Sequence, residues 1–576
     1  MRSRPGFLAA LAIGLLSLAR SPASAQSIGP YVPPTEAEKR SPEPPPRLAQ
    51  SGAIESPVVL LPASEAAREQ LEAMEARNRA GQEPLQVGIP RPLTDVIEAR
   101  IPGDPSRAPA DPHSIQVRAA TGAGIWGTRV TIRDAYGIRL HLTDVHLPPG
   151  TKLWSYGTEG NPVAFGLELL GPGGDLWTPM TFGETSFLDV ELPPTGATGG
   201  FSIVEAAEMR PLAVSAEPPC AIDAVCVTPT TFSPIAEAMS AVAVLIFQVG
   251  SSTFQCTGTL LSDTAQDGIP YLLTANHCIS TQAAATSLTA FWDYHAPACG
   301  GAAPALGSVP RSSGATLLAH SATSDFSFLR LNAVPAGRAF MGWNASSSAV
   351  PRNTTLFRVS CPASTTDLNT VLQQQLSEYD TPLPTSGCLG TNFVNSMKTS
   401  GYAFEGSSGS AVMLANGQVV GQLYGTCANI TNPCTQPDNT IDGAFSITYP
   451  SVAQWLSPAN QSCVPDTATL CLNTRFQVTA QWQKPDGSSG PGTAVPLTAD
   501  TGYFWFFDPS NVEVITKVLN GCGIDNHYWV FSAGLTNVGV TLTYTDTGTG
   551  VRKSYPNPIG TAFAPIQDTS AFATCP

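Results

Sequence analysis

Short runs of alternating apolar and polar residues, separated by Gly and Pro, dominate the chain from about residue 114 onward. In 114–216, the runs TRVTIRD, IRLHLTDVHL and TSFLDVEL are separated by PPG, GPGG and PPTG, which predicts a small β-sandwich. In 217–460, runs such as AVAVLIFQV, QCTGTLLS and FSFLRL predict a β-barrel architecture that ends in a helix at YPSVAQWLSPA. Alternation in RFQVTAQW predicts an accessory β domain in 461–576.

The first 113 residues have a different pattern. Residues 1–25 contain Arg2 and Arg4, the apolar run FLAALAIGLLSLA and a final Ala-Ser-Ala, which is typical of a signal peptide. We therefore expect a secreted (extracellular) or periplasmic protein. Residues 26–113 are rich in Pro, Ala and charged residues, which predicts a Pro-rich linker or prosegment with one helix within 63–80. No run reaches the roughly 20 apolar residues of a membrane helix, so no membrane span is expected.

The composition of the chain argues against some classes of binding partner. The chain of 576 residues has a formal net charge of −15 and only 13% charged residues, so it lacks a basic patch for nucleic acid. All 13 cysteines follow residue 219, which predicts disulfides in an oxidising compartment. In the last unit these are Cys463–Cys471 and Cys522–Cys575. No Cys or His cluster has zinc spacing, so we expect no metal and no cofactor. We also expect a monomer.

The motif EGSSGS at 405–410 carries the strongest chemical signal. A serine hydroxyl is a weak nucleophile that needs a base and amide donors for the developing oxyanion. Gly406 and Gly409 permit a tight turn that presents Ser408, with the amides of Gly406 and Ser408 as the predicted oxyanion hole. Alone, the motif is also compatible with an exposed Gly/Ser loop.

Two further segments supply the partners of Ser408. His277 follows the β-like run YLLTAN and precedes Cys278, and a bridge from Cys278 to Cys256 would fix its loop as a general base requires. Asp325 in SATSDFSFLRL is the predicted carboxylate that orients the imidazole, with Asp293 in FWDYH as an alternative. The order His, Asp, Ser is that of chymotrypsin-like enzymes. We predict the triad His277, Asp325 and Ser408.

The central segment, from Cys220 to about Pro458, resembles the bacterial lysyl endopeptidases of the trypsin-like clan. The matching pieces are CAIDAVC, CTGTLL, YLLTANHC, FWDY, ATSDFSFLRL, MGWN, EGSSGS, VVGQLYG and QWLSP. The resemblance implies an all-β, chymotrypsin-like double β-barrel with a C-terminal helix, flanked by N-terminal and C-terminal β-sandwich-like domains. The β-sandwich in 114–216 likewise resembles the prosegment domains that precede such enzymes. It also implies the disulfides Cys226–Cys299 and Cys256–Cys278, and a third from Cys220 to Cys427 or Cys434. Cys361 and Cys388 form a plausible further pair.

The match is weaker where the family determines specificity. Lysine-cleaving relatives carry a pocket acid just before the last strand, where this chain has Asn439, with Asp442 close by as the candidate acid. The residue that is a histidine in those relatives is Tyr424 here, and Gly425 next to it is a further candidate for substrate binding. Six residues before Ser408, where trypsin has its acid, stands Tyr402.

The resulting hypothesis is a secreted serine endopeptidase that hydrolyses peptide bonds of protein or peptide substrates through an acyl-enzyme, with cleavage after basic residues such as lysine. The alternative is a secreted homologue with weak or no catalytic activity that acts as a binding protein. The intact triad favours the enzyme, because inactive homologues usually lose one of its members.

Overall fold

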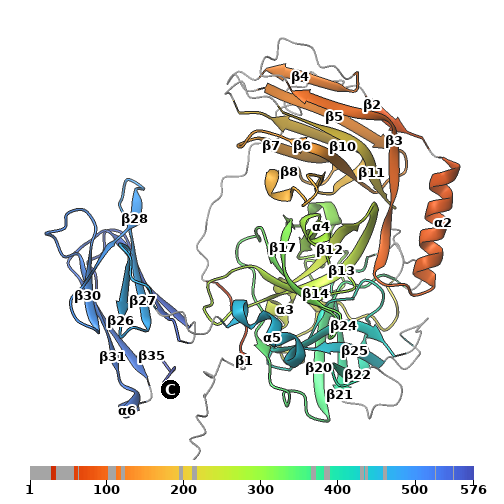
Figure 1. Ribbon diagram of the computed structural model, residues 1–576. Helices are drawn as coiled ribbons and strands as arrows, with labels where there is room; N and C mark the ends of the chain where they lie inside the picture. Colours follow the sequence, from red (N-terminus) through yellow and green to blue (C-terminus); the bar gives the residue numbers. More distant parts are fainter. Residues whose placement is uncertain are drawn as a thin grey trace, which may run out of the picture.

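The computed structural model describes three folded units (Figure 1). The described residues are 27–33, 58–62, 64–101, 112–118, 124–193, 199–210, 217–364, 371–381, 390–427, 434, 439–457, 463–525, 527–548 and 551–575. The predicted signal peptide therefore lies outside the described residues. No helix in the described part of the chain is long and apolar enough to cross a membrane.

The central unit begins with a β-barrel. Its strands pair antiparallel in the spatial order β15, β12, β13, β14, β18, β17, with β16 beside β15. Helices α3 (Ile235–Ala241) and α4 (Gln282–Thr286) accompany this barrel. The strand bounds are β12 (Val242–Val249), β13 (Ser252–Leu261), β14 (Tyr271–Ala275), β15 (Thr289–Trp292), β16 (Arg311–Ser313), β17 (Ala315–Ser321) and β18 (Phe326–Leu331).

A second barrel follows in the same unit. Its strands pair in the order β24, β23, β20, β21, β22, β25, and β25 closes the ring by pairing with β24. Helix α5 (Phe445–Leu456) comes directly after β25. The strand bounds are β19 (Trp343–Asn344), β20 (Thr354–Ser360), β21 (Gln375–Thr381), β22 (Phe393–Gly401), β23 (Ala411–Met413), β24 (Val419–Thr426) and β25 (Asn439–Ala444).

One apolar core joins both barrels and the helix. Leu245 and Phe328 of the first barrel belong to the same buried cluster as Trp343, Met413 and Phe445. Burial of apolar surface is the main stabilising contribution to such a core. The predicted all-β, chymotrypsin-like double β-barrel with a C-terminal helix is confirmed.

The N-terminal unit is a β-sandwich with one long helix. Its buried cluster includes Ile97, Trp126, Leu140, Leu188 and Ile203. Its main elements are β2 (Val58–Leu61), α2 (Glu65–Arg79), β3 (Leu85–Ile101), β4 (Ser114–Arg118), β5 (Gly124–Ile132), β6 (Gly137–His146), β7 (Lys152–Glu159), β10 (Thr181–Glu191) and β11 (Gly199–Met209); the short strands β8 (Val163–Phe165) and β9 (Leu176–Trp177) complete it.

Helix α2 lies within the range predicted from the sequence, whereas β3 differs from the prediction of linker. It contains Pro90 and Pro92, which disfavour a central strand. It nevertheless pairs with β11 along most of its length, with a shift of register between Ile203 and Glu205 of β11. Leu93, Ile97 and Ala99 of β3 are buried in the sandwich core. The apolar contacts of these residues explain why the strand forms despite its prolines.

The C-terminal unit consists of two five-stranded sheets. Phe476, Val478 and Ala480 share the buried face of β27, as the alternation predicts, and Trp482 is half-buried. The first sheet contains β26 (Thr469–Leu472), β27 (Phe476–Gln483), β28 (Ser489–Pro491), β33 (Gly539–Asp546) and β34 (Arg552–Asn557). The second contains β29 (Thr493–Pro496), β30 (Thr501–Trp505), β31 (Val514–Asn520), β32 (Tyr528–Gly534) and β35 (Ile566–Phe572), with helix α6 (Cys522–Asp525) between β31 and β32.

Five disulfides follow the predicted pairing. They are Cys220–Cys434, Cys226–Cys299, Cys256–Cys278, Cys463–Cys471 and Cys522–Cys575. The pairing of Cys361 with Cys388 is wrong, because Cys361 is a free thiol. It is fully buried in an apolar cluster with Tyr294 and Leu306. Cys388 lies outside the described residues, and Cys427 is disulfide-bonded.

Candidate active site

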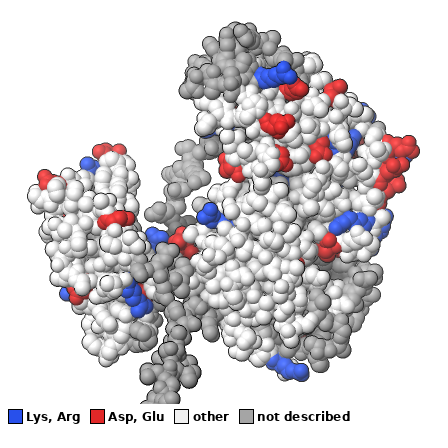
Figure 2. Space-filling model, viewed as in Figure 1, with Lys and Arg blue, Asp and Glu red and all other residues white. Residues whose placement is uncertain are grey.

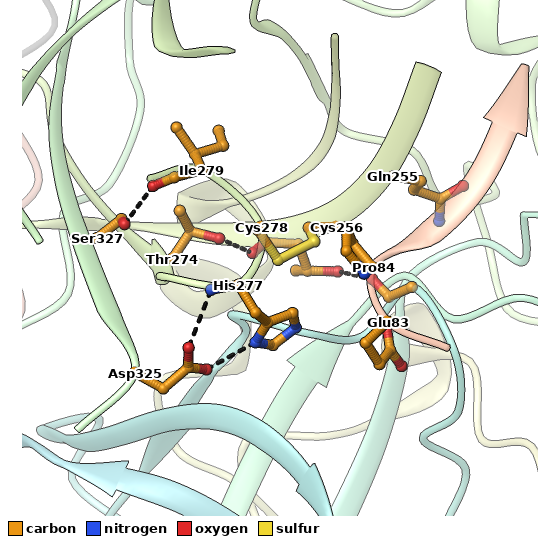
Figure 3. Close-up of a disulfide and its surroundings, with 12 residues drawn as sticks. Glu83, Pro84, Gln255, Cys256, Thr274, His277, Cys278, Ile279, Asp325 and Ser327 are labelled. Atoms are coloured by element: carbon orange, nitrogen blue, oxygen red, sulfur yellow. Dashed lines mark hydrogen bonds and ion pairs between the residues drawn. A yellow bond between two sulfur atoms is a disulfide. The ribbon is translucent and has the colours of Figure 1, made fainter. Parts of the chain in front are cut away.

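His277 and Asp325 lie side by side at the ends of two paired strands of the first barrel (Figure 3). His277 lies just beyond the end of β14, and Asp325 immediately precedes β18, which pairs with β14. The Nδ1 of His277 lies 2.7 Å from the Oδ2 of Asp325, and the backbone N–H of His277 donates to Oδ1 at 2.9 Å. Both carboxylate oxygens therefore orient the same histidine.

Backbone contacts hold Asp325 in place. Its φ of 49° is in the left-handed region, which aspartate adopts more readily than most residues. Its carbonyl oxygen accepts a hydrogen bond from the amide of Asn276 at 3.0 Å. Gln422 of β24, in the second barrel, donates to the carbonyl of Ser324 at 2.6 Å. Both barrels thus position the carboxylate.

The EGSSGS loop depends on both glycines. Gly406 and Gly409 have φ values of 84° and 82°, which disfavour any other residue. A Cβ on Gly409 would lie 2.2 Å from the Oγ1 of Thr274, and one on Gly406 would lie 2.7 Å from the Nε2 of Gln255. The loop therefore fits against the first barrel only with glycine at these positions.

Strand β13 fixes Ser408 close to His277. The amide of Thr257 donates to the carbonyl of Ser408, and its hydroxyl donates to the carbonyl of Gly406, both at 2.9 Å. The neighbouring Cys256 is bonded to Cys278, which follows His277 directly. The backbone of Ser408 and the loop of His277 are therefore bound to adjacent residues of one strand, and Ser408 and Asp325 are almost fully buried.

A residue of the N-terminal unit lies beside the histidine. Figure 3 shows Glu83 and Pro84 next to the imidazole, on the side away from Asp325. The Nε2 of His277 is buried and has no hydrogen-bond partner among the described residues. The atom that would exchange protons with Ser408 therefore makes no hydrogen bond with the described residues.

Electrostatics favour the protonated form of His277. Burial opposes the charge of the imidazolium, but the hydrogen bond and charge of Asp325 and the charge of Glu83 together raise the pKa of His277. The carboxyl group of Glu83 is surrounded by atoms of both units, although the residue as a whole is exposed. This environment raises the pKa of Glu83, while the charge of His277 and the hydrogen bond from Ser408 act against the rise.

The carboxylate of Asp293, the alternative partner for His277, forms an ion pair with another residue. Asp293 forms a two-pronged pair with the guanidinium of Arg338, with both N–O distances at 2.6 Å. His277 also lies close to the sulfurs of Cys256 and Cys278, the one group in the described part of the chain with the spacing of metal ligands. Those sulfurs form a disulfide, so they are not the thiolates that bind metals.

Asp442 does not line a substrate pocket, which corrects the prediction from its position in the sequence. Its side chain is fully buried, and one oxygen lies 2.6 Å from the Nη2 of Arg358, which is also fully buried. Arg358 donates in addition to the carbonyl of Ser410 at 2.8 Å. The carboxylate of Asp442 therefore neutralises the buried Arg358, which in turn binds the backbone after Ser408. Because it is fully buried, it is inaccessible to substrate.

The other predicted specificity residues lie at or near the site. Tyr424 is 39% exposed, and its ring packs edge-on against His277 with the centroids 5.9 Å apart. Gly425 follows it on β24. The Oδ1 of Asn439 is buried and has no hydrogen-bond partner in the described ranges. Tyr402 is fully buried and donates to the carbonyl of Ala363 at 2.9 Å, so it has a structural role.

Three residues at the site were not predicted from the sequence. Glu83 and Arg77 belong to the segment that was predicted to be mainly linker, and no local motif marks them. Glu405 stands inside the serine motif itself, three residues before Ser408. The presence of an acidic residue in this motif could have indicated a role at the site. Its Oε2 is buried without a hydrogen-bond partner among the described residues. Burial and the charge of Glu83 raise the pKa of Glu405 to about 8, against the opposing charge of Arg77.

A double β-barrel with a histidine, an aspartate and a serine brought together in this order defines the class of chymotrypsin-like serine proteases. Within this class, residues 215–442 match the family described as lysyl endopeptidase, C-terminal domain. The resemblance predicted from the sequence motifs is thus confirmed for this part of the chain.

The similarity to individual proteins is low and covers only part of the chain. A lysyl endopeptidase from Pseudomonas aeruginosa is 28% identical over 187 residues, which are 30% of this chain and 40% of that protein. The active form of the Rv3671c protease from M. tuberculosis is 12% identical, with a TM-score of 0.26, over 42% of this chain and 92% of its own. The HtrA-type protease AlgW with a tripeptide is 13% identical, with a TM-score of 0.28, over 43% of this chain and 69% of its own.

Replacement of Asp442 with alanine should destabilise the central unit. The change leaves Arg358 as an uncompensated buried cation, which costs about 3–5 kcal/mol. Denaturant unfolding measures the loss. Asp293→Ala, which breaks a partly buried pair in the same unit, is the matched control and should cost less, because the side chain of Asp293 is 32% exposed. Equal effects of the two changes would contradict the structural role of Asp442.

Replacement of Asp325 with asparagine should lower the pKa of His277. The change removes the charge that most favours the imidazolium, while the burial that disfavours it remains. Because the pKa of the folded state is raised, the associated stability is present at low pH and is lost as pH rises through that pKa. Titration of the imidazole by NMR checks the direction, and an unchanged or higher pKa in the variant would refute it.

Proposed function

We propose that the protein is a serine endopeptidase that hydrolyses peptide bonds through an acyl-enzyme. In this reaction Ser408 attacks the carbonyl carbon, and His277 takes the proton of its hydroxyl and then passes it to the leaving amine. Water then hydrolyses the ester with the same histidine as base. The observation that carries the proposal is the carboxylate of Asp325, which binds both the Nδ1 and the backbone amide of His277.

Asp325 fixes the imidazole so that Nε2 is the atom that exchanges protons. The oxyanion that forms on the substrate would be bound by the amides of Gly406 and Ser408, which is the largest electrostatic contribution in such sites. The reaction also requires that a peptide can reach these groups. The similarity of residues 215–442 to lysyl endopeptidases supports this reaction class.

Protein and peptide substrates suit the composition and surface of the chain. Lys and Arg side chains are scattered and interspersed with acidic ones on the face in Figure 2, and much of the central unit's surface there is uncharged. Such a surface offers no extended cationic track for a phosphate backbone. We propose that the chain acts as an exported monomer, in keeping with its disulfides.

Cleavage after a basic residue is the finer part of the proposal. It rests on the similarity to lysyl endopeptidases and on the position of Glu405 beside Ser408. The buried pair of Asp442 with Arg358 leaves Glu405 as the acid that an incoming cation meets at the site, with the unpaired Oδ1 of Asn439 as a neutral acceptor. A cation near Glu405 also has a precedent in the structure, because Arg77 lies close enough to lower its pKa.

Replacement of Ser408 with alanine should abolish casein hydrolysis. Loss of the nucleophile lowers turnover by about 10⁴-fold or more in enzymes of this type. The matched control is Thr323→Ala, an exposed position near Asp325, which should retain the wild-type rate. Labelling by a fluorophosphonate separates the enzyme from an inactive homologue that acts as a binding protein. Wild-type turnover in Ser408→Ala would refute the proposed function.

Replacement of Glu405 with glutamine should reduce the preference for a basic residue. Mass spectrometry of a mixed-peptide digest identifies the residue before each cleaved bond, and kcat/KM for a lysine peptide should fall about tenfold, as loss of one charge-assisted hydrogen bond predicts. Peptides with alanine at the same position should be cleaved at an unchanged rate. Glu237→Gln on α3 is the control. An unaltered lysine-to-alanine ratio would exclude Glu405 as the specificity residue.

A further inference from the structure

The C-terminal unit has a cleft of about 540 Å³ at one end of its sandwich. Three loops line it, namely 507–513 between β30 and β31, 534–538 between β32 and β33, and 562–563 between β34 and β35. Loops at the end of a β-sandwich are common positions for binding sites, because the sheets beneath hold them in place. Binding sites for small ligands have volumes of roughly 300–1,000 Å³, so this cleft can hold part of a ligand the size of a short peptide.

Backbone hydrogen bonds connect the three loops to one another. The amide of Leu535 in the second loop donates to the carbonyl of Glu513 in the first, at 2.8 Å. The amide of Phe563 in the third loop donates to the carbonyl of Thr536 in the second, at 3.3 Å. A cleft that is formed before binding loses less conformational entropy when a ligand enters. The loops therefore provide a preformed site.

Glu513 is the one charged residue among the described residues that line the cleft. It is only 5% exposed, and Asn511 donates to one of its carboxylate oxygens at 2.5 Å. Within the described residues, this carboxylate forms no ion pair with a cation. A buried carboxylate without a cation is unfavourable, because burial removes its solvation. The cleft therefore favours a ligand that brings a positive charge to Glu513.

The rim of the cleft is apolar. Leu535 is 83% exposed, and Phe507, Val512 and Ile559 are 44%, 37% and 40% exposed. Ile559 precedes a glycine whose amide donates to the carbonyl of Asn537 in the lining. Exposed apolar side chains that gather around a polar cleft are typical of an interaction site. Aliphatic side chains such as these suit the apolar side chains of a polypeptide better than the hydroxyl groups of a sugar.

Phe507 forms one wall of the cleft and is held by two residues at the end of β27. Trp482 makes an edge-on contact with its ring, with the centroids 5.0 Å apart. The Nζ of Lys484 lies 4.3 Å from the centre of the same ring. A ring that binds one ammonium group can also bind the aliphatic and charged parts of a basic side chain in a ligand.

We propose that this cleft is a docking site for the protein substrate and that it binds a polypeptide segment with one basic residue flanked by apolar residues. The basic side chain pairs with Glu513, and the apolar side chains pack on Leu535 and Phe507. The inference rests on the proposed peptidase function, which makes polypeptides the ligands of this chain. Because the docking unit and the protease unit are parts of one chain, a docked substrate has a raised effective concentration at the active site.

The test compares hydrolysis of casein with that of a lysine tripeptide anilide, which is long enough for the active site alone. Glu513→Gln should raise the KM for casein about tenfold with little change in kcat, as loss of one charge-assisted hydrogen bond predicts. Leu535→Ser should raise the same KM severalfold and leaves the core intact, because this side chain is exposed. Both variants should hydrolyse the anilide at the wild-type rate.

Each cleft variant has a matched control in the same unit. Asp466→Asn neutralises an exposed acid outside the cleft. Leu497→Ser changes a leucine that is 55% exposed in the turn before β30, at the other end of that strand. Both controls should retain the wild-type KM for casein.

Direct binding measures docking without turnover. Fluorescence anisotropy of labelled casein with full-length Ser408→Ala gives the Kd, which should rise about tenfold when Glu513→Gln is added. An unchanged Kd in both cleft variants would overturn the docking site and leave the peptidase untouched. Displacement of the casein by maltohexaose, lost in Glu513→Gln, would overturn polypeptide as the ligand class.

The kinetic outcomes separate the docking site from the active site. A parallel loss of casein and anilide hydrolysis in the cleft variants would place their effect in the active site and overturn the docking site. If wild type hydrolysed neither substrate but bound casein in a manner that depends on Glu513, the proposed peptidase function would fail and polypeptide binding by the cleft would stand.

Discussion

The pair of hydrogen bonds from Asp325 to His277 is the constraint on which the site depends. One oxygen holds the backbone and the other holds the ring, so the imidazole has little freedom to turn. Asp325 is itself held by Asn276 in the first barrel and, through Ser324, by Gln422 in the second. The geometry of the histidine is therefore a consequence of how the two barrels dock, and the core shared by Phe328 and Phe445 stabilises that docking.

Strand β13 connects the nucleophile, the base and strand β3 of the N-terminal unit. Thr257 binds the backbone of Ser408, the disulfide of Cys256 holds the loop of His277, and Gln255 pairs with Leu85. These three consecutive residues of one strand serve three different parts of the site. A peptide that pairs with this strand is thereby aligned with the reacting groups, which explains why the N-terminal unit approaches the barrel at this edge (Figure 1).

The barrels and the geometry around His277 were largely predictable because the signals are local. Alternating strands, glycines at 406 and 409 and the Cys278 next to His277 are each visible in short stretches of sequence. The position of Glu83 beside His277 was not predictable, because it depends on the pairing of β3 with β13, across about 170 residues of sequence. The role of Asp442 was misassigned for a related reason: its partner Arg358 is on another strand, and no local pattern links the two.

The internal pair of Arg358 and Asp442 also changes how charge is distributed beneath the site. The two groups are fully buried and of opposite sign, so they contribute little net field at the cleft. A substrate cation consequently gains no attraction from an acid at that depth, in contrast to what the position of Asp442 in the sequence suggests. Glu405 stands three residues before Ser408, and helix α2 brings the guanidinium of Arg77 near it. Burial is the main cause of the raised pKa of Glu405, and the charges of Glu83 and Arg77 act on that pKa in opposite directions.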